Sequence, residues 1–143
     1  MNTDRLKYKD ITDGILRSFY EVYNELGEGF LESVYENALY IVLTGYGLRI
    51  ERQKDISVFF RGSIIGDFKT DLIVNEKVIV ELKAIRTLDT VHEAQLINYL
   101  KATNIEVGLL LNFGKNQNSR DLSMIIKEKI SAIISVNLWL KNE

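Results

Sequence analysis

The sequence predicts an α+β or α/β fold, in which a mixed β-sheet core carries helices on both faces. Two segments with helical periodicity come first, three β-branched or aromatic runs follow, and a further helical segment then precedes one more apolar run. The chain has 143 residues and an apolar fraction of 46%, which is the size and composition of one ordinary domain. We therefore expect residues 1–143 to form a single domain.

The first two elements are predicted helices. Over residues 11–26, apolar side chains recur at the i, i+3, i+4, i+7 spacing of an amphipathic helix. A glycine-rich stretch interrupts that pattern, and a second helical pattern runs over residues 30–46, where two glycines close it. Two helices should therefore precede the sheet.

A three-strand antiparallel meander is expected next. β-branched and aromatic residues dominate from Ile50 onward, and residues 56–60, 64–74 and 78–83 form three runs with strand character. Turn chemistry at residues 61–63 separates the first two runs. The short polar segment at residues 75–77 separates the last two.

The second half of the chain should complete a mixed sheet. Thr90 and Glu93 match a capping box, with Thr90 as the N-cap of a helix that follows the third strand. Residues 105–111 have the composition of another buried strand, and a strand–helix–strand succession favours a right-handed parallel crossover. After a polar loop at residues 114–119, the apolar pattern over residues 122–140 predicts a C-terminal helix.

The amino-acid composition limits which metal sites and catalytic groups the protein can contain. The chain has no cysteine, which excludes disulfides, thiolate zinc sites, iron–sulfur clusters and cysteine nucleophiles, and its single histidine argues against a histidine-rich metal site. Any metal would have to be held by oxygen. The net charge of −2 is awkward for a nucleic-acid enzyme, because phosphate affinity comes mostly from Lys and Arg. With no signal-like or membrane-length apolar run, we expect a cytoplasmic protein without membrane contact.

Two acids and a lysine stand at the ends of apolar runs in residues 71–83. Glu81 and Lys83 are two residues apart on one strand and must point to the same face, but Asp71 lies on the preceding strand. A two-residue loop would place Asp71 opposite Val80, with the two carboxylates on opposite faces. A three-residue loop over residues 75–77 instead places Asp71 opposite Glu81. We predict this loop or an equivalent bulge.

Two opposed carboxylates repel one another unless a cation lies between them. Magnesium accepts one or two carboxylates together with waters and phosphate oxygens, so Asp71 and Glu81 could hold it. Lys83 could then orient an attacking water or neutralise charge that develops on a phosphate. The alternative is an ion pair of Lys83 with Asp71 or Glu81 at a strand end, and the spacing alone leaves both readings open.

Asp71 followed by Glu81-Leu82-Lys83 resembles the signature of the PD-(D/E)XK phosphodiesterase superfamily, which has the restriction-endonuclease-like fold. Gly29-Phe30-Leu31-Glu32-Ser33-Val34-Tyr35 fits the pattern that names the GxxExxY proteins of that superfamily. The resemblance continues through residues 51–53, 78–84, 92–100 and 111–114 and spans roughly residues 8–114. Thr70 stands where the superfamily name implies proline, a difference that removes no ligand.

The resemblance implies roles for individual residues. Asp71 and Glu81 would be metal-binding acids, Leu82 would lend its backbone carbonyl, and Lys83 would be the catalytic lysine. Glu32 would complete the metal site from the second helix; its alternative is a helix-start carboxylate favoured by the dipole. Three further side chains would support the site or contact substrate: Tyr35, Gln95 and Tyr99. Gln95 and Tyr99 could equally be a polar pair on an exposed helix face. His92, in the first turn of the same helix, could contact a phosphate of the substrate or cover the end of the sheet, and we favour the structural position.

Two functions follow as hypotheses. The first is a nuclease dependent on Mg²⁺ or Mn²⁺, with nucleic acid as substrate and DNA favoured over RNA. The second is a nuclease-fold module without catalytic activity that serves in binding or assembly. It would contact nucleic acid or other proteins, for example through its apolar C-terminal helix. A homodimer is favoured, because one phosphodiesterase site often needs a second copy to address both strands of a duplex.

Overall fold

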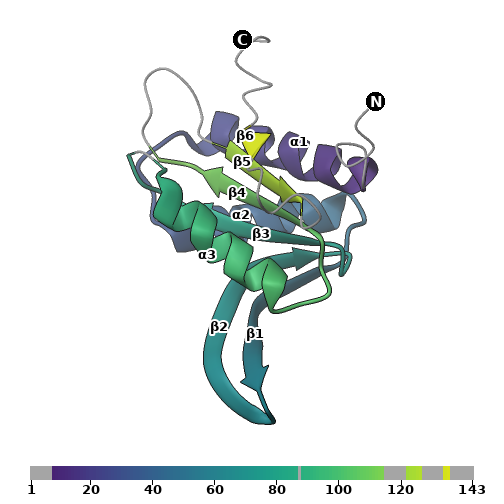
Figure 1. Cartoon of the computed structure of the whole chain (residues 1–143). Coiled ribbons are helices and arrows are strands. Elements are labelled where there is room, and N and C mark those ends of the chain that lie inside the picture. Colours follow the sequence, from purple (N-terminus) through teal and green to yellow (C-terminus); the bar gives the residue numbers. More distant parts are fainter. Residues whose placement is uncertain (1–7, 87, 115–121, 127–133, 136–143) are drawn as a thin grey trace.

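The computed structural model describes residues 8–86, 88–114, 122–126 and 134–135, which build one mixed sheet with helices around it (Figure 1). Strand order is β1-β2-β3-β4-β5-β6; β3 and β4 are parallel and the other neighbours are antiparallel. The elements are α1 (Lys9–Leu26), α2 (Glu32–Gly45), β1 (Ile50–Phe60), β2 (Ser63–Val74), β3 (Val78–Lys83), α3 (Thr90–Lys101), β4 (Val107–Asn112), β5 (Leu122–Ile126) and β6 (Ile134–Ser135). The predicted mixed sheet is confirmed.

Helices cover both faces of the sheet, as the sequence predicts. Alternate residues of β2 and β3, such as Leu72 and Val80, pack in one apolar cluster with α1 and α2. The intervening residues, such as Ile73 and Ile79, pack in a second cluster with α3. Because side chains alternate along a strand, this division fixes which helix each strand residue faces. Among the described residues, no helix is long and apolar enough to span a membrane.

The loop between β2 and β3 has the predicted three residues. Val74 pairs with Val78, and the Lys77 N–H donates to the Val74 carbonyl at 2.9 Å. Asn75 and Glu76 both have positive φ, 52° and 59°, the left-handed pair whose twist matches that of a hairpin. The Asn75 side-chain oxygen also accepts from the Arg49 N–H at 2.8 Å, which ties this loop to the start of β1. The predicted register is confirmed.

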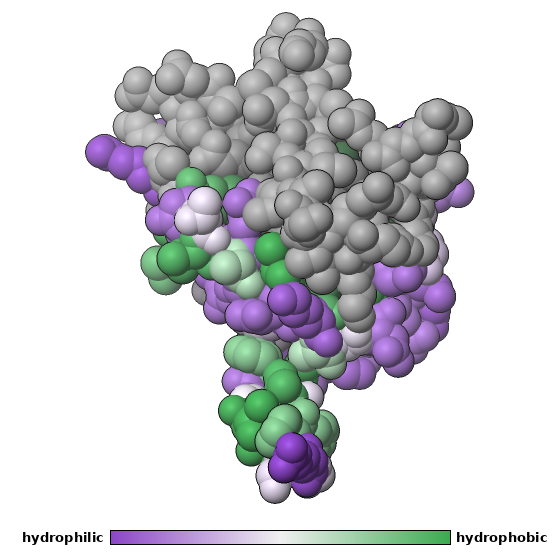
Figure 2. Space-filling view, in the orientation of Figure 1, coloured by the Kyte–Doolittle hydropathy of each residue, from purple (hydrophilic) through white to green (hydrophobic). Residues whose placement is uncertain are grey.

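β1 and β2 continue well beyond β3 and form a projecting two-stranded arm, here residues 54–60 and 63–70 (Figure 1). Large apolar side chains near its end are exposed: Phe59 by 64%, Phe60 by 56%, Ile64 by 55% and Ile65 by 65%. Figure 2 shows this end as a hydrophobic patch with a hydrophilic tip. The turn between β1 and β2 contains Arg61. The arm leaves the sheet directly beside Asp71 of β2.

Two predictions about the second half of the chain are wrong. Asp89, and not Thr90, is the N-cap of α3: its carboxylate accepts from the Val91 N–H at 2.9 Å, and His92 Nδ1 accepts from the Asp89 N–H at 3.1 Å. The predicted C-terminal helix over 122–140 is replaced, where described, by β5 and β6. β5 pairs with the fully buried β4, whose edge would otherwise leave backbone groups unbonded, and this pairing overrides the local helical pattern. The rest of that segment lies outside the described residues.

Asn112 and Gly114 fix the chain where it leaves β3. The buried Asn112 amide accepts from the Ile85 N–H at 3.1 Å and donates to the Ile85 carbonyl at 3.0 Å. A Cβ placed on Gly114 would lie 1.6 Å from the Ile85 carbonyl oxygen, a distance that only backbone movement can relieve. The segment just after Lys83 is therefore held in place by β4.

We expect Gly114→Ala to lower the free energy of unfolding by about 2 kcal/mol or more, because the added methyl overlaps backbone. Gly45→Ala is the matched control, since a Cβ there meets nothing within 4 Å and alanine favours the helix. Urea titration followed by circular dichroism measures both. Equal stability of the two variants would contradict the close approach.

Candidate metal-binding active site

Asp71 and Glu81 meet where the β2–β3 ladder ends. Backbone pairing runs from Val74–Val78 to Leu72–Val80, and the same register places Asp71 opposite Glu81. Beyond Leu72–Val80, side-chain carboxylates accept the hydrogen bonds of backbone N–H groups. Glu81 Oε2 accepts from the Asp71 N–H at 3.0 Å, and Asp71 Oδ2 accepts from the Leu82 N–H at 2.7 Å. Each acid is thus anchored by the backbone of the neighbouring strand. The two strands bring both carboxylates into one small region.

Burial makes this pair of charges costly. Glu81 is only 5% exposed, and its burial, followed by the charge of Asp71, raises its pKa to about 8. Burial also raises the pKa of Asp71, although hydrogen bonds from the Leu82 N–H and the Gln53 side chain act in the opposite direction. Paired carboxylates with raised pKa values are common at functional sites. Buried charges are costly, so they are usually found where they serve a function or where a group of opposite charge compensates them.

Lys83 lies on the same side of β3 as Glu81 and is half-buried. Its positive charge lowers the pKa of both acids, so its ammonium is within electrostatic reach of each. In the described part of the chain, no ion pair within 4 Å joins Lys83 to either acid. The simple ion pair considered from the sequence is therefore not formed.

Glu32 is the first residue of α2 and is exposed. Its charge raises the pKa of Asp71, which places it on the side of the sheet end where the acid pair lies. Within the described ranges, however, no three Asp, Glu, His or Cys side chains converge closely enough to hold one ion. The two strand acids therefore form the compact part of the site, and Glu32 stands at its margin.

Tyr99 of α3 lies close enough to the acid pair for the two carboxylate charges to affect its pKa. It is 4% exposed, and burial followed by the charges of Glu81 and Asp71 raises its pKa to about 12. The Gln95 side chain, one turn earlier, acts in the opposite direction on this pKa. The ring of Phe68 packs against that of Tyr99 with centroids 5.3 Å apart. Tyr99 is thus buried near the acids, whereas Gln95, one turn earlier on the same helix, is exposed.

Tyr35 and His92 have local structural contacts. The Tyr35 hydroxyl donates to the Gly27 carbonyl at 2.6 Å and accepts from the Phe30 N–H at 3.2 Å, and its ring stacks on Phe113 at 4.4 Å. It therefore fixes the loop that leads into α2. His92 is the capping partner of Asp89 described above.

Two site neighbours were not among the predicted residues. Glu36 of α2, 8% exposed, accepts from Gln53 Nε2 at 2.7 Å, and the same nitrogen lies 3.4 Å from Asp71 Oδ1. Two signals in the sequence point to them. Glu36 follows Glu32 at the spacing of one helical turn. Gln53 takes the place opposite Asp71 in the β1–β2 register, between the Arg52–Leu72 and Lys54–Thr70 pairs.

The residues present fit a hard divalent cation. Asp71 and Glu81 offer two buried carboxylates to which no described Lys, Arg or His is ion-paired, and the Leu82 carbonyl lies between Glu81 and Lys83 on the same strand. This donor set is all oxygen, which suits Mg²⁺ or Mn²⁺ with water or phosphate oxygens as the remaining ligands. Binding of a dication would remove the mutual repulsion that raises the pKa of Glu81.

Comparison with known proteins shows the superfamily of the chain and a similar fold. A family model described as the PD-(D/E)XK nuclease superfamily matches residues 9–125, so the chain belongs to that superfamily. The fold resembles that in a solved structure titled "Crystal structure of SSO0001", with a TM-score of 0.52 and 19% sequence identity. That match covers 86% of this chain, which spans only 59% of the SSO0001 chain, and it concerns the fold alone. No curated protein is similar enough to be counted as a relative.

The raised pKa of Glu81 predicts how stability changes with pH in the metal-free protein. A carboxyl whose pKa is about 8 when folded and 4.5 when unfolded stabilises the fold fully below pH 4.5, and this contribution is lost as the pH rises through 8. Glu81→Gln stays neutral and should remove most of that loss. We expect it to raise the midpoint of thermal unfolding at pH 8.5 by about 3 °C or more.

Thermal unfolding in EDTA between pH 5 and pH 9 measures this effect. Glu25→Gln, a substitution at an exposed position of α1, is the control and should follow the unsubstituted protein. A decline with pH that is as steep in Glu81→Gln as in the unsubstituted protein would show that Glu81 is not its source.

Proposed function

We propose that this protein is a nuclease that hydrolyses phosphodiester bonds in nucleic acid with Mg²⁺ or Mn²⁺. The observation that carries the proposal is the buried pair of Asp71 and Glu81, opposed on neighbouring strands and within electrostatic reach of Lys83. Membership of the PD-(D/E)XK nuclease superfamily supports the same chemistry. Fold alone would not, because one fold can serve several functions.

Asp71 and Glu81 would hold the ion through their carboxylates, and Leu82 would add its carbonyl. When bound, the ion supplies Lewis-acid stabilisation of a phosphate oxygen. The hydrogen bonds from the Asp71 and Leu82 N–H groups keep the two carboxylates in place, so little reorganisation is needed when a substrate arrives.

Lys83 would supply positive charge that the acids do not already neutralise through a close contact. Its ammonium is placed to orient an attacking water or to stabilise the negative charge that develops on the phosphate. Tyr99 would donate a hydrogen bond beside the same carboxylates, with Gln95 supporting it; burial raises its pKa further above neutral pH, to about 12. These roles would bring together side chains from β3 and α3.

The finer assignment that we propose is to the GxxExxY proteins, and two contacts support it. Gly29 has φ of 107°, a conformation that favours glycine, and Tyr35 bonds through its hydroxyl to the backbone on either side of that residue. This loop sets the start of α2, so that Glu32 would approach the metal from the margin of the site as a further ligand or through water.

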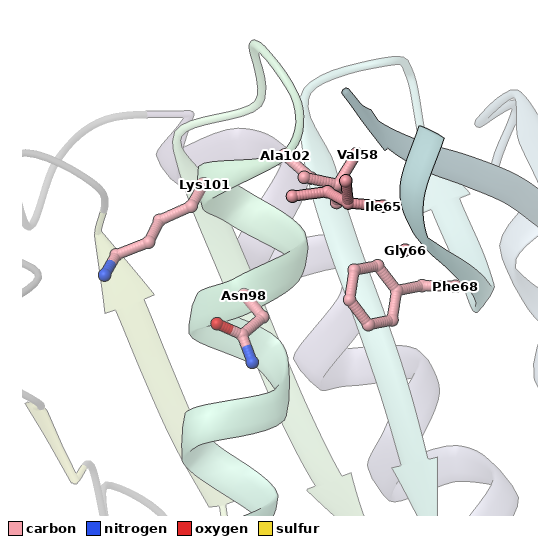
Figure 3. Close-up of a pocket in the computed structure, with 7 residues that line it drawn as sticks. All are labelled: Val58, Ile65, Gly66, Phe68, Asn98, Lys101 and Ala102. Carbon is pink, nitrogen blue, oxygen red and sulfur yellow. The ribbon is translucent and has the colours of Figure 1, made fainter. Parts of the chain in front are cut away.

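A nucleic-acid substrate, DNA in preference to RNA, would lie between the arm and α3. A groove of about 350 Å³ there is lined by Val58, Ile65, Gly66, Phe68, Asn98, Lys101 and Ala102 (Figure 3). Phe68 links this groove to Tyr99 and so to the acid pair. Lys54 and Lys69 of the arm are engaged with Glu51 and Asp55. Among the described cations near this groove, we expect Arg61 and Lys101 to meet phosphate.

The exposed apolar end of the arm favours a second function, that of a binding or assembly module. Four large apolar side chains that the sheet cannot cover are unusual on a protein surface and often mark a contact with another macromolecule. The same feature would suit the homodimer expected from the sequence. Dimerisation, a single domain over residues 1–143 and a cytoplasmic location remain proposals.

Nuclease activity is tested with single-stranded and double-stranded DNA and RNA in Mg²⁺, Mn²⁺ or EDTA. We expect cleavage only with metal, and a loss of at least about 100-fold in Asp71→Asn and in Lys83→Met. Calorimetry with Mn²⁺ separates the two roles, because Lys83→Met should still bind the ion whereas Asp71→Asn should not.

Asp67→Asn, on the same strand as Asp71 but exposed on the arm, is the matched control and should cleave normally. Metal-dependent cleavage that survives Asp71→Asn would refute the mechanism. If the unsubstituted protein cleaves none of these substrates with either metal, the binding module becomes the better account.

A further inference from the structure

Gln53 has an unusual backbone conformation that core packing does not explain, because its side chain is exposed. Its φ of 49° lies in the left-handed region, although it stands within the long strand β1 and is exposed. Residues other than glycine adopt this conformation at a cost of about 1 kcal/mol or more, and such strain gathers at functional sites. The strained residue lies opposite Asp71 in the β1–β2 register.

The Gln53 side chain joins two elements that pack on different parts of the molecule. Its amide nitrogen donates to Glu36 Oε1 at 2.7 Å and contacts Asp71 Oδ1 at 3.4 Å. An amide nitrogen has two hydrogens, so it can serve both acceptors at once. In a regular strand Gln53 would share the face of Asp71, which is the face of α3; the left-handed φ interrupts that alternation and lets it reach α2 as well.

Glu36 is a firm anchor for this link. It is 8% exposed, and its second oxygen accepts from Arg52 Nε at 3.1 Å. The Arg52 guanidinium is in turn hydrogen-bonded to Asn37 and lies 4.8 Å from the Tyr40 ring centre, so it is held along α2. Gln53 therefore receives its position from a carboxylate that is itself fixed on a helix.

Both oxygens of Asp71 are then restrained. Oδ2 accepts from the Leu82 N–H at 2.7 Å on β3, and Oδ1 lies against the Gln53 amide of β1. A carboxylate contacted from both sides cannot rotate freely about its last bond. Groups that orient a metal ligand in this way commonly change metal affinity by about 10- to 100-fold when removed.

We propose that Gln53 is a positioning residue of the site: held by Glu36, its amide fixes the Asp71 carboxylate in the orientation that binds the divalent metal. The inference rests on the proposed metal-dependent function. The competing account is that Gln53 only secures β1 to α2, in which case its loss would lower stability and leave metal binding unchanged.

Gln53→Gly separates these accounts, because glycine removes the amide and also tolerates the left-handed φ. We expect Mn²⁺ affinity, measured by calorimetry, to fall about 10-fold while the midpoint of thermal unfolding in EDTA stays within about 3 °C. In cleavage assays the metal concentration for half-maximal rate should rise by the same factor, and kcat should recover at saturating metal. Glu36→Gln should shift the affinity in the same direction by less.

Glu76→Gly is the matched control, since Glu76 has a similar φ of 59° but lies in the β2–β3 loop. It should bind Mn²⁺ like the unsubstituted protein. Unchanged affinity in Gln53→Gly, or a fall in stability without a fall in affinity, would overturn the positioning role. Failure of the unsubstituted protein to bind Mn²⁺, or full binding by Asp71→Asn, would instead overturn the metal site itself.

Discussion

The loop between β2 and β3 is the constraint on which the site depends. Side chains alternate along strands, so changing the loop by one residue would move Asp71 to the face opposite Glu81 and Lys83. The left-handed conformations of Asn75 and Glu76 and the bonds between Asn75 and Arg49 hold the loop at three residues. The position of the Asp71 carboxylate beside Glu81 and Lys83 therefore depends on the geometry of a turn some four residues away.

The second constraint is electrostatic. Bringing Asp71 and Glu81 together in a buried region disfavours their charged forms, as the raised pKa values of both show. Backbone N–H groups offset part of this cost, and Lys83 offsets part without a close contact. A cation between the acids would remove most of the remainder, so the unfavourable terms in the metal-free protein are the same terms that would favour metal binding.

Strand parity and helical periodicity predict much of this architecture from the sequence. They place the first two helices and the meander, and the three-residue loop follows from parity once both acids are required on one face. The helical pattern after Leu122 misleads, because the unpaired edge of β4 selects a strand and pairing between distant segments is not encoded in local periodicity. Thr90 misleads for a smaller reason: Asp89, one residue earlier, is as good an N-cap and has His92 as its partner.

The Glu36–Gln53 link escapes sequence analysis because it depends on a backbone conformation that no spacing rule gives. A glutamine in a strand is expected to alternate with its neighbours, and α2 would then lie on the wrong side for it. Only the left-handed φ at Gln53 lets one side chain contact both Glu36 and Asp71. The same strand continues from this residue into the arm. Gln53 is thus both a neighbour of the acid pair and the residue of β1 that directly precedes the arm.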